Sequence, residues 1–329
     1  MHFGQNCFIV YYEKTIDDIL KNKEESLMRK VAVIGMGHVG ATAAFILFTH
    51  GVADELVLLD KNETKCRAEW GDLRDTLGRN DFYVNVKWGD WKELADADLI
   101  ITAFGDVAAS ITTGDRFAEF PINTKNAVEV GQKIKDSGFK GVIINISNPC
   151  DVVTSILQKV TGLPKSQVFG TGTFLDTSRM QRVVGEKLGQ DPRNVSGFNL
   201  GEHGSSQFTA WSTVWVNNRP AKDLFNEAEK EEMDRLSKDN AFMVGKGKGY
   251  TCYAVATCAV RLARAVFSDA KFYGPTSCYV ESLGTYIGYP SIVGKHGVEE
   301  VPVLDLPADE QAKLEASAKK LKDSLASLE

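Results

Sequence analysis

Residues 31–60 read VAVIGMGHVGATAAFILFTHGVADELVLLD, and this stretch decides the fold class. VAVIG (31–35) is a short, β-branched run that ends in glycine, as is typical of a buried parallel strand. ATAAFILF (41–48) has the composition of a buried helix, and ELVLLD (55–60) has that of a second strand. A strand, a helix and another strand in this order predict a βαβ unit with parallel strands.

GMGHVG joins the first strand to the helix and places Gly35, Gly37 and Gly40 in the pattern G-x-G-x-x-G. Gly35 allows the tight turn, Gly37 lets a pyrophosphate approach the backbone N–H groups, and Gly40 packs the helix on the sheet. The alternative is a plain turn, but the flanking strand and helix favour a dinucleotide site. Asp60, which ends the next strand, would bind ribose hydroxyls and repel a 2′-phosphate, so we expect NAD as the cofactor.

The alternation of strands and helices continues through the first half of the chain. The segments 82–88, 97–105 and 141–147 resemble strands, and the segments 62–78 and 121–138 resemble helices. Beyond about Gly170 the alternation is lost, and helices mix with strands such as TAWSTVWVN (209–217). We therefore predict an α/β protein with a Rossmann-type doubly wound parallel sheet at 29–170, followed by an α+β catalytic domain at 171–329. Residues 1–28 form an N-terminal extension to which we assign no role.

Composition excludes several classes of protein. The net charge of −6 argues against a nucleic-acid-binding surface, and no apolar run is long enough to span a bilayer. The six cysteines lack the spacing CxxC and the five histidines lack HxxxH, so we expect no metal site. Scattered thiols of this kind are typical of a reducing compartment, and we expect a cytoplasmic protein.

Two stretches follow predicted strands, at the edge where open α/β sheets bind ligands. FGDVAASITTGDR (104–116) has the length of a mobile lid that would carry Arg116 to a substrate; the alternative is a solvated arginine that begins the next helix. In ISNPCD (146–151), Asn148 is suited to bind a substrate hydroxyl or carbonyl group, unless it only ends the strand in a turn. Pro149 keeps Asn148 out of helical geometry and allows a cis peptide bond.

Two further stretches carry charged or titratable groups. If FLDTSRMQRVVGEKL (174–188) is a helix, Asp176 and Arg179 share one face. They could form an ordinary surface ion pair, or each could have its own role in the chemistry. Arg179 would bind a carboxylate with its planar fork, and Asp176 would orient an imidazole. In NLGEHGSSQ (199–207), His203 has small or polar neighbours, so we expect its imidazole ring to be accessible to a substrate. The alternative is a ring whose hydrogen bonds are made by the local backbone. With an ordinary pKa of about 6.5, histidine can accept and return a hydroxyl proton.

GMGHVG, Asp60, SNP, LDTSRMQ, GEHGSS and GKGYT occur in the order and spacing of the L-lactate/malate dehydrogenase family, which the chain resembles from about Met28 to about residue 310. Within that family, GVADELVLLD, TGDRFAE, GTGTFLDTSRMQR, SGFNLGEHG and KGKGYT are most similar to the L-2-hydroxyisocaproate dehydrogenases. The resemblance implies a homo-tetramer or homodimer that acts on a small 2-oxo or 2-hydroxy acid. It also implies a role for each matching residue: acid/base for His203, its partner for Asp176, carboxylate binding for Arg179, carbonyl polarisation for Arg116, and substrate contacts for Asn148 and Thr251.

The lid departs from better-known relatives. Malate dehydrogenases place an arginine there for the second carboxylate, whereas residues 105–115 contain no cation and Asp106 and Asp115 would repel a dicarboxylate. Where lactate dehydrogenases usually carry a glutamine, this chain has Ala108, Ala109, Ser110 and Ile111. We therefore expect an NAD-dependent L-2-hydroxyacid dehydrogenase that prefers bulky aliphatic or aromatic side chains. The alternatives are an L-lactate dehydrogenase that uses pyruvate and a non-catalytic NAD(H)-binding sensor.

Overall fold

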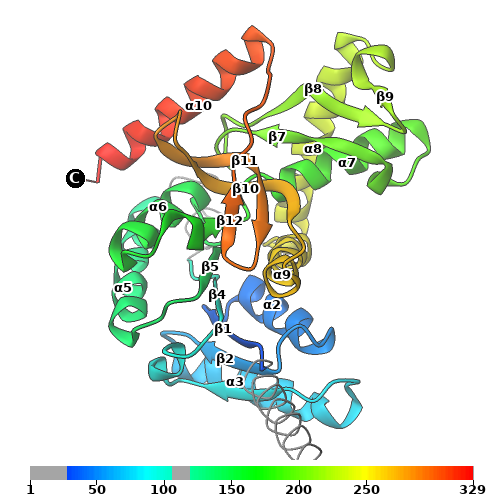
Figure 1. Cartoon of the computed structure of the whole chain (residues 1–329). Helices are drawn as coiled ribbons and strands as arrows, with labels where there is room; N and C mark the ends of the chain where they lie inside the picture. The colour runs from blue at the N-terminus through cyan, green and yellow to red at the C-terminus, as the bar shows by residue number, and fades with distance from the viewer. Residues whose placement is uncertain (1–27, 106–118, 329) are drawn as a thin grey trace, which may run out of the picture.

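The structure, a computed structural model, describes residues 28–105 and 119–328, and a nine-stranded sheet runs through its centre (Figure 1). In spatial order the strands are β12 (Gly297–Glu300), β11 (Thr285–Gly294), β10 (Phe272–Val280), β6 (Val168–Gly170), β5 (Val142–Asn145), β4 (Leu99–Thr102), β1 (Lys30–Ile34), β2 (Glu55–Leu59) and β3 (Asn85–Trp88). The six strands from β6 to β3 are parallel, in the order of a doubly wound sheet. The predicted fold class is confirmed.

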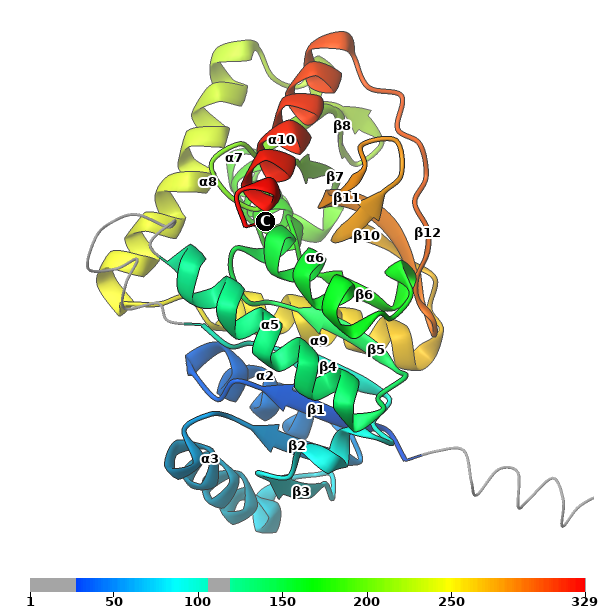
Figure 2. The same cartoon turned by 90° about the vertical axis from the view of Figure 1, so that its left-hand side faces the viewer.

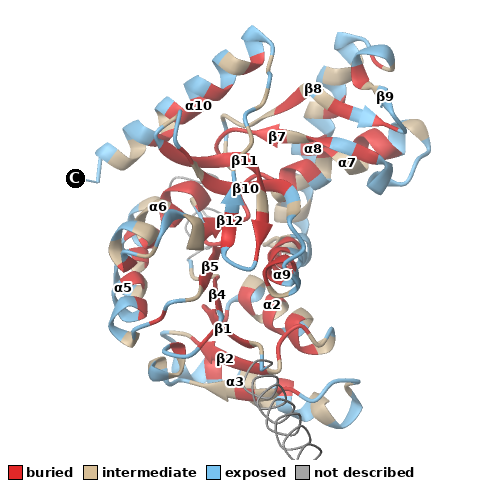
Figure 3. Ribbon diagram, in the orientation of Figure 1, coloured by how far each residue is buried: buried red, intermediate tan, exposed pale blue. Residues whose placement is uncertain are grey.

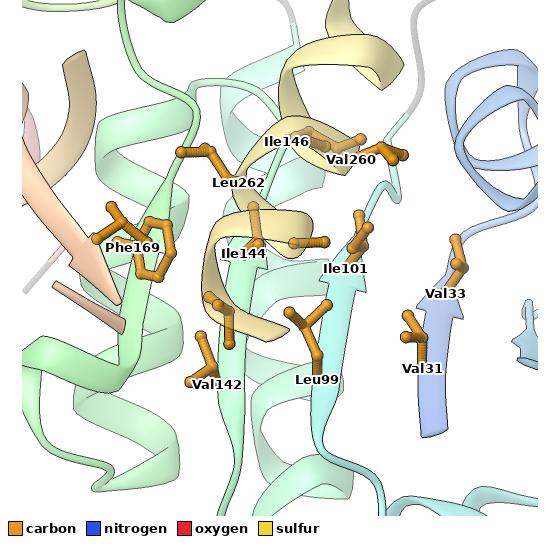
Figure 4. Close-up of a cluster of buried hydrophobic side chains, with 14 of the residues drawn as sticks. Val31, Val33, Leu99, Ile101, Val142, Ile144, Ile146, Phe169, Val260 and Leu262 are labelled. Atoms are coloured by element: carbon orange, nitrogen blue, oxygen red, sulfur yellow. The ribbon is translucent and has the colours of Figure 1, made fainter. Parts of the chain in front are cut away.

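Helices cover both faces of this sheet. The helices α5 (Phe120–Ser137) and α6 (Cys150–Thr161) lie on one face, and α2 (His38–Thr49), α3 (Glu63–Asp75) and α9 (Tyr253–Ser268) lie on the other (Figures 1 and 2). Side chains along β1 alternate between the two cores, since Val31 and Val33 join one core while Ala32 and Ile34 join the other. Figure 4 shows the first of these cores, in which strand residues point toward Val260 and Leu262. Burial on both faces explains why these strands are continuously apolar.

The second half of the chain adds to the central sheet and builds a smaller one. β10 pairs antiparallel with β6, so β10, β11 and β12 extend the Rossmann-type sheet at one edge. The strands β7 (Val195–Leu200), β8 (Phe208–Val216) and β9 (Arg219–Pro220) form a three-stranded antiparallel sheet. It lies beside α7 (Phe174–Leu188) and α8 (Glu227–Lys248) around a third apolar core (Figure 1). The last helix, α10 (Ala308–Ala326), packs on β11 and α6.

Three expected strands are shorter in the structure: 82–88 is reduced to Asn85–Trp88, 97–105 to Leu99–Thr102 and 141–147 to Val142–Asn145. The segment 82–88 enters the sheet only at Asn85, and Phe82 and Tyr83 are 46% and 82% exposed. Their aromatic side chains favour a strand locally, but β2, the partner of β3, begins only at Glu55, which pairs with Asn85. The helix predicted at 174–188 is found at these bounds. The division of the chain near residue 170 stays a prediction.

Buried residues concentrate on the central strands and on the helix faces turned toward them (Figure 3). The five cysteines within the described residues are all buried free thiols. Among the helices that the structure describes, none combines the length and the apolar character needed to cross a membrane.

Candidate active site

The candidate residues of the first half lie at the carboxyl ends of the parallel strands. Gly35 follows β1, Asp60 follows β2 and Asn148 lies shortly after β5. The strand order reverses between β1 and β4, because β1 pairs with β2 on one side and with β4 on the other. In open α/β sheets the crevice outside this switch point receives the ligand.

The turn between β1 and α2 has the geometry of a pyrophosphate cradle. Gly35 has a φ of +100°, and a Cβ atom there would lie 2.6 Å from the backbone carbonyl carbon of Ala103. A Cβ on Gly40 would lie 1.8 Å from the Gly35 oxygen, so only glycine lets the helix pack against the turn. A Cβ on Gly37, in contrast, would meet nothing within 4 Å, which leaves the N-terminus of α2 open to a ligand.

The carboxylate of Asp60 lies beside this turn. It accepts hydrogen bonds from the Met36 N–H at 2.5 Å and from the Asn62 N–H at 2.7 Å. These contacts hold a negative charge next to the cradle, where it would bind ribose hydroxyls. The three glycines and Asp60 therefore form one continuous site, and its open glycine and its carboxylate fit an NAD molecule.

The second half of the chain brings His203, Asp176 and Arg179 together. The Nδ1 atom of His203 lies 2.6 Å from Oδ2 of Asp176, and the Nη1 atom of Arg179 lies 3.0 Å from Oδ1 of the same carboxylate. The side chain of Asp176 is 5% exposed, while those of Arg179 and His203 keep 14% and 15%. The Arg179 guanidinium and the His203 ring thus share one buried carboxylate, and both side chains still reach solvent.

The electrostatics of Asp176 follow from these neighbours. Burial by itself would raise the pKa of its carboxyl group, but the charge and hydrogen bond of His203 and the charge of Arg179 outweigh that effect and lower the pKa to about 2. Asp176 is therefore a permanent anion at neutral pH. An anion at Nδ1 favours a proton on that ring nitrogen.

The loop that carries His203 is held at several points. Gly201 has a φ of +98° and exchanges two backbone hydrogen bonds of 3.0 Å with Gly288 of β11. The N–H of Glu202 donates to Ser317 Oγ of α10 at 2.7 Å. The N–H of His203 donates to Oδ2 of Asp151 at 2.8 Å. Sequence alone does not single out Asp151, because an acidic residue in the first turn of a helix is ordinary.

Asn148 is exposed and precedes a cis peptide bond to Pro149. Its carbonyl oxygen accepts a hydrogen bond of 2.8 Å from Nδ2 of Asn123. His203 donates its backbone N–H to Asp151, which lies three residues further along this segment. The predicted substrate contact of Asn148 stays a prediction.

Thr251 is partly exposed and lies just before α9. The ring of the preceding Tyr250 stacks on His38, the first residue of α2, with centroids 3.6 Å apart and an interplanar angle of 3°. This stack places the segment that contains Thr251 beside the dinucleotide turn, a proximity that local sequence patterns do not contain. Further along α9, Cys258 lies close enough to Asp176 for the charge of that carboxylate to contribute to raising the pKa of the thiol, although burial is the larger cause. Thr251 is thus near the turn, and α9 passes the His203 group.

Arg116 and residues 106–115 of the predicted lid (104–116) lie outside the described residues. Within the described part of the chain, no group of three or more histidine, cysteine or acidic side chains is arranged to hold a metal ion.

Comparisons with known proteins show the family to which the chain belongs. Residues 29–170 match the family model described as the lactate/malate dehydrogenase NAD binding domain, and residues 173–329 match its alpha/beta C-terminal domain. An L-lactate dehydrogenase of Bifidobacterium longum is 37% identical over 305 residues, which are 89% of this chain and 96% of that protein. The minor L-lactate dehydrogenase of Enterococcus mundtii in its ligand-bound form has a TM-score of 0.87 at 32% identity and covers 92% of this chain and 99% of its own. A lactate dehydrogenase from a deep-sea metagenome library of the Medee basin has a TM-score of 0.86 at 31% identity, with coverages of 91% and 98%.

Proposed function

This chain belongs to the lactate/malate dehydrogenase family, and we propose that it is an L-lactate dehydrogenase that reduces pyruvate and oxidises L-lactate. Its cofactor is NAD, as expected from Gly35, Gly37, Gly40 and Asp60. The names of the relatives support the substrate, since those described above are lactate dehydrogenases. The more specific resemblance to L-2-hydroxyisocaproate dehydrogenases is not confirmed by these comparisons.

The observation that carries the proposal is the 2.6 Å contact between His203 and Asp176, with Arg179 on the same carboxylate. In the direction of reduction, a protonated His203 donates its Nε2 proton to the substrate oxygen, and the Asp176 anion stabilises the imidazolium before transfer. In the direction of oxidation, neutral His203 removes the hydroxyl proton. Bound NADH would supply the hydride for reduction, and bound NAD⁺ would accept it in oxidation. Asp176 thereby fixes the ring orientation in both directions.

Arg179 is proposed to bind the substrate carboxylate. One of its nitrogens contacts Asp176, and its side chain keeps 14% exposure. The guanidinium has five N–H donors in a planar fork, so the contact with Asp176 leaves donors for a bidentate pair. Asn148 and Thr251 would contact the rest of the substrate. Arg116 would polarise its carbonyl group from the lid, and closure of the lid would follow binding of the cofactor and then of the substrate.

A 2-oxo acid with a larger side chain is the second candidate substrate. Its support is the sequence of residues 105–115, which contains no cation and includes Ala108, Ala109 and Ile111. A lid without a cation disfavours oxaloacetate, because a buried second carboxylate would lack a partner. An extra methylene group changes discrimination by only about 1–3 kcal/mol, so several monocarboxylic acids are expected to react.

The test compares kcat/KM for pyruvate, 2-oxoisocaproate, phenylpyruvate and oxaloacetate, with NADH consumption as the signal. We expect pyruvate to be preferred and oxaloacetate to be the poorest substrate. Preference for 2-oxoisocaproate or phenylpyruvate would replace the lactate assignment by the second candidate. Binding of NADH without turnover of any of the four acids would indicate the non-catalytic sensor and reject both.

A further inference from the structure

Asp151 is a buried carboxylate that the proposed reaction does not use. It is the second residue of α6 and is 2% exposed. Its two oxygens have separate donors, since Oδ2 accepts the His203 N–H at 2.8 Å and Oδ1 accepts the hydroxyl proton of Ser277 at 2.6 Å. The carboxylate therefore ties α6 and β10 to the residue that carries the imidazole.

His203 is held by two different carboxylates at its two ends. Asp176 of α7 contacts the ring at Nδ1, and Asp151 of α6 contacts the backbone amide. The backbone on the N-terminal side is anchored as well, because Gly201 pairs with Gly288. With the main chain held on one side and the ring on the other, the position of Nε2 depends on both carboxylates.

The charge of Asp151 acts on neighbours from three parts of the described chain. The titratable groups that face it are His203 and Glu202 from the loop after β7, Cys150 from α6 and Cys278 from β10. Glu202 has its own cationic partner, Lys320 of α10, at 2.7 Å. Burial raises the pKa of both thiols to about 12, so they are neutral at physiological pH. His203 is thus the cationic group that faces Asp151 among these neighbours.

Asp151 is ionised at neutral pH in spite of its burial. Burial raises the pKa of its carboxyl group to about 6, while the donors Ser277 and His203 and the charge of His203 act in the opposite direction. A negative charge in a buried environment is screened less than one at the surface. It therefore stabilises a positive charge that forms on a nearby imidazole.

We propose that Asp151 is a positioning residue for the acid/base: it holds the His203 backbone so that the ring meets Asp176, and its negative charge favours the imidazolium form. The inference rests on the proposed role of His203 in the reduction of a 2-oxo acid. It predicts that the interval of pH in which the protein reduces its substrate is set by two carboxylates, Asp176 and Asp151.

The main test variant is Asp151→Asn, which keeps a side-chain oxygen for the His203 N–H and removes the charge. Asp234→Asn is the matched control. Burial also raises the pKa of Asp234, but its hydrogen-bond donors are Thr209 and Trp211. Two quantities are measured for each full-length protein: the dependence of kcat/KM for pyruvate reduction on pH, and the titration of the His203 ring by NMR. A His203→Gln variant identifies the His203 signal among the five histidines of the chain.

For Asp151→Asn we expect the decline of kcat/KM at high pH to begin about 0.5–1 pH unit lower, because the imidazolium loses a nearby anion. The NMR titration of His203 should move by the same amount, and Asp234→Asn should move neither curve. A uniform loss of kcat/KM at every pH, with an unchanged His203 titration, would show that Asp151 is merely structural and overturn the proposal.

The NMR titration separates this inference from the proposed function. If the unaltered protein turns over no 2-oxo acid, the proposed function fails. A comparison of the His203 titration in the unaltered protein and in Asp151→Asn still decides whether the charge of Asp151 acts on the ring. Asp151→Ala adds the loss of the hydrogen bond to the loss of charge. If that variant does not fold, the results for Asp151→Asn alone decide whether the proposal holds.

Discussion

The Nδ1 atom of His203 lies 2.6 Å from Oδ2 of Asp176, although these residues stand 27 positions apart and belong to a loop and a helix. The contact pairs a titratable ring with an anion that is itself buried. Charge-assisted hydrogen bonds of this kind are short, and they fix the orientation of the ring. The proposed chemistry depends on this relationship more than on any other contact.

Replacement of Arg179 by lysine should weaken substrate binding. Lysine keeps the positive charge but loses the planar fork that holds a carboxylate by two hydrogen bonds. Loss of one hydrogen bond to a charged group costs about 1.5–3 kcal/mol, so we expect KM for pyruvate to rise roughly 10- to 100-fold. Arg182→Lys is the control, because Arg182 lies on the same helix and pairs with Glu186 instead. Equal KM values for the two variants would remove Arg179 from carboxylate binding.

Replacement of Asp60 by serine should relax the choice of cofactor. The change removes the charge that would repel a 2′-phosphate and leaves one acceptor for the Met36 and Asn62 amides. We expect the ratio of kcat/KM with NADH to kcat/KM with NADPH to fall about tenfold or more, which corresponds to about 1.4 kcal/mol. A ratio that stays at the original value would mean that another residue excludes the phosphate.

The stability of the protein should depend on pH through Asp151. Its pKa rises from 3.8 to about 6 on folding, because burial disfavours the ionised form. An acid with a raised pKa contributes stability that is complete below the unfolded pKa and is lost as the pH rises through the folded pKa. We therefore expect the free energy of unfolding, relative to that of Asp151→Asn, to fall by about 1–3 kcal/mol between pH 4 and pH 6. Urea unfolding at several pH values measures this difference, and a constant difference would contradict the burial argument.

The start of β1 contains a buried ion-pair cluster whose loss should destabilise the fold. The side chain of Lys30 is 7% exposed and pairs with Glu55 at 3.1 Å, Glu93 at 2.6 Å and Asp96 at 2.6 Å. Lys30→Met would leave the buried carboxylate of Glu55, which is 8% exposed, with fewer partners, and this costs about 3 kcal/mol in comparable buried pairs. The exposed pair of Lys319 and Asp323 provides the control, since Lys319→Met should change the unfolding free energy by less than about 1 kcal/mol. Similar losses in both variants would contradict this difference between buried and exposed pairs.

The first half of the fold could be predicted because its signals are local. Each strand of the βαβ units is an apolar run, and the glycines of GMGHVG are required by geometry at Gly35 and Gly40. The extension of the sheet by β10, β11 and β12 could not be predicted in the same way. It depends on Ser277 meeting Gly170, a pairing between distant parts of the chain that no local pattern contains. α8 was also missed, although the capping box of Asn226 and Glu229 marks its beginning.

The residues of the candidate site also differ in whether local sequence could identify them. His203, Asp176 and Arg179 have side chains that local spacing and chemistry single out, and the structure brings them together. Asp151 escaped notice because its partners, the His203 backbone and Ser277, come from elements far away in the sequence. The preference for a substrate with a larger side chain was inferred from the lid, and residues 106–116 of the lid lie outside the described residues. The effect of the lid on substrate choice is therefore still a prediction from sequence.

The most direct test of the account is the reduction of pyruvate by His203→Gln, with NADH binding measured separately by fluorescence. His296→Gln, a change at an exposed histidine, is the control. If His203 is the acid/base, kcat should fall by about 10²–10⁴-fold while the Kd for NADH stays within about twofold. A kcat within about threefold of the original, with equal NADH binding, would place proton transfer on another group and contradict the account.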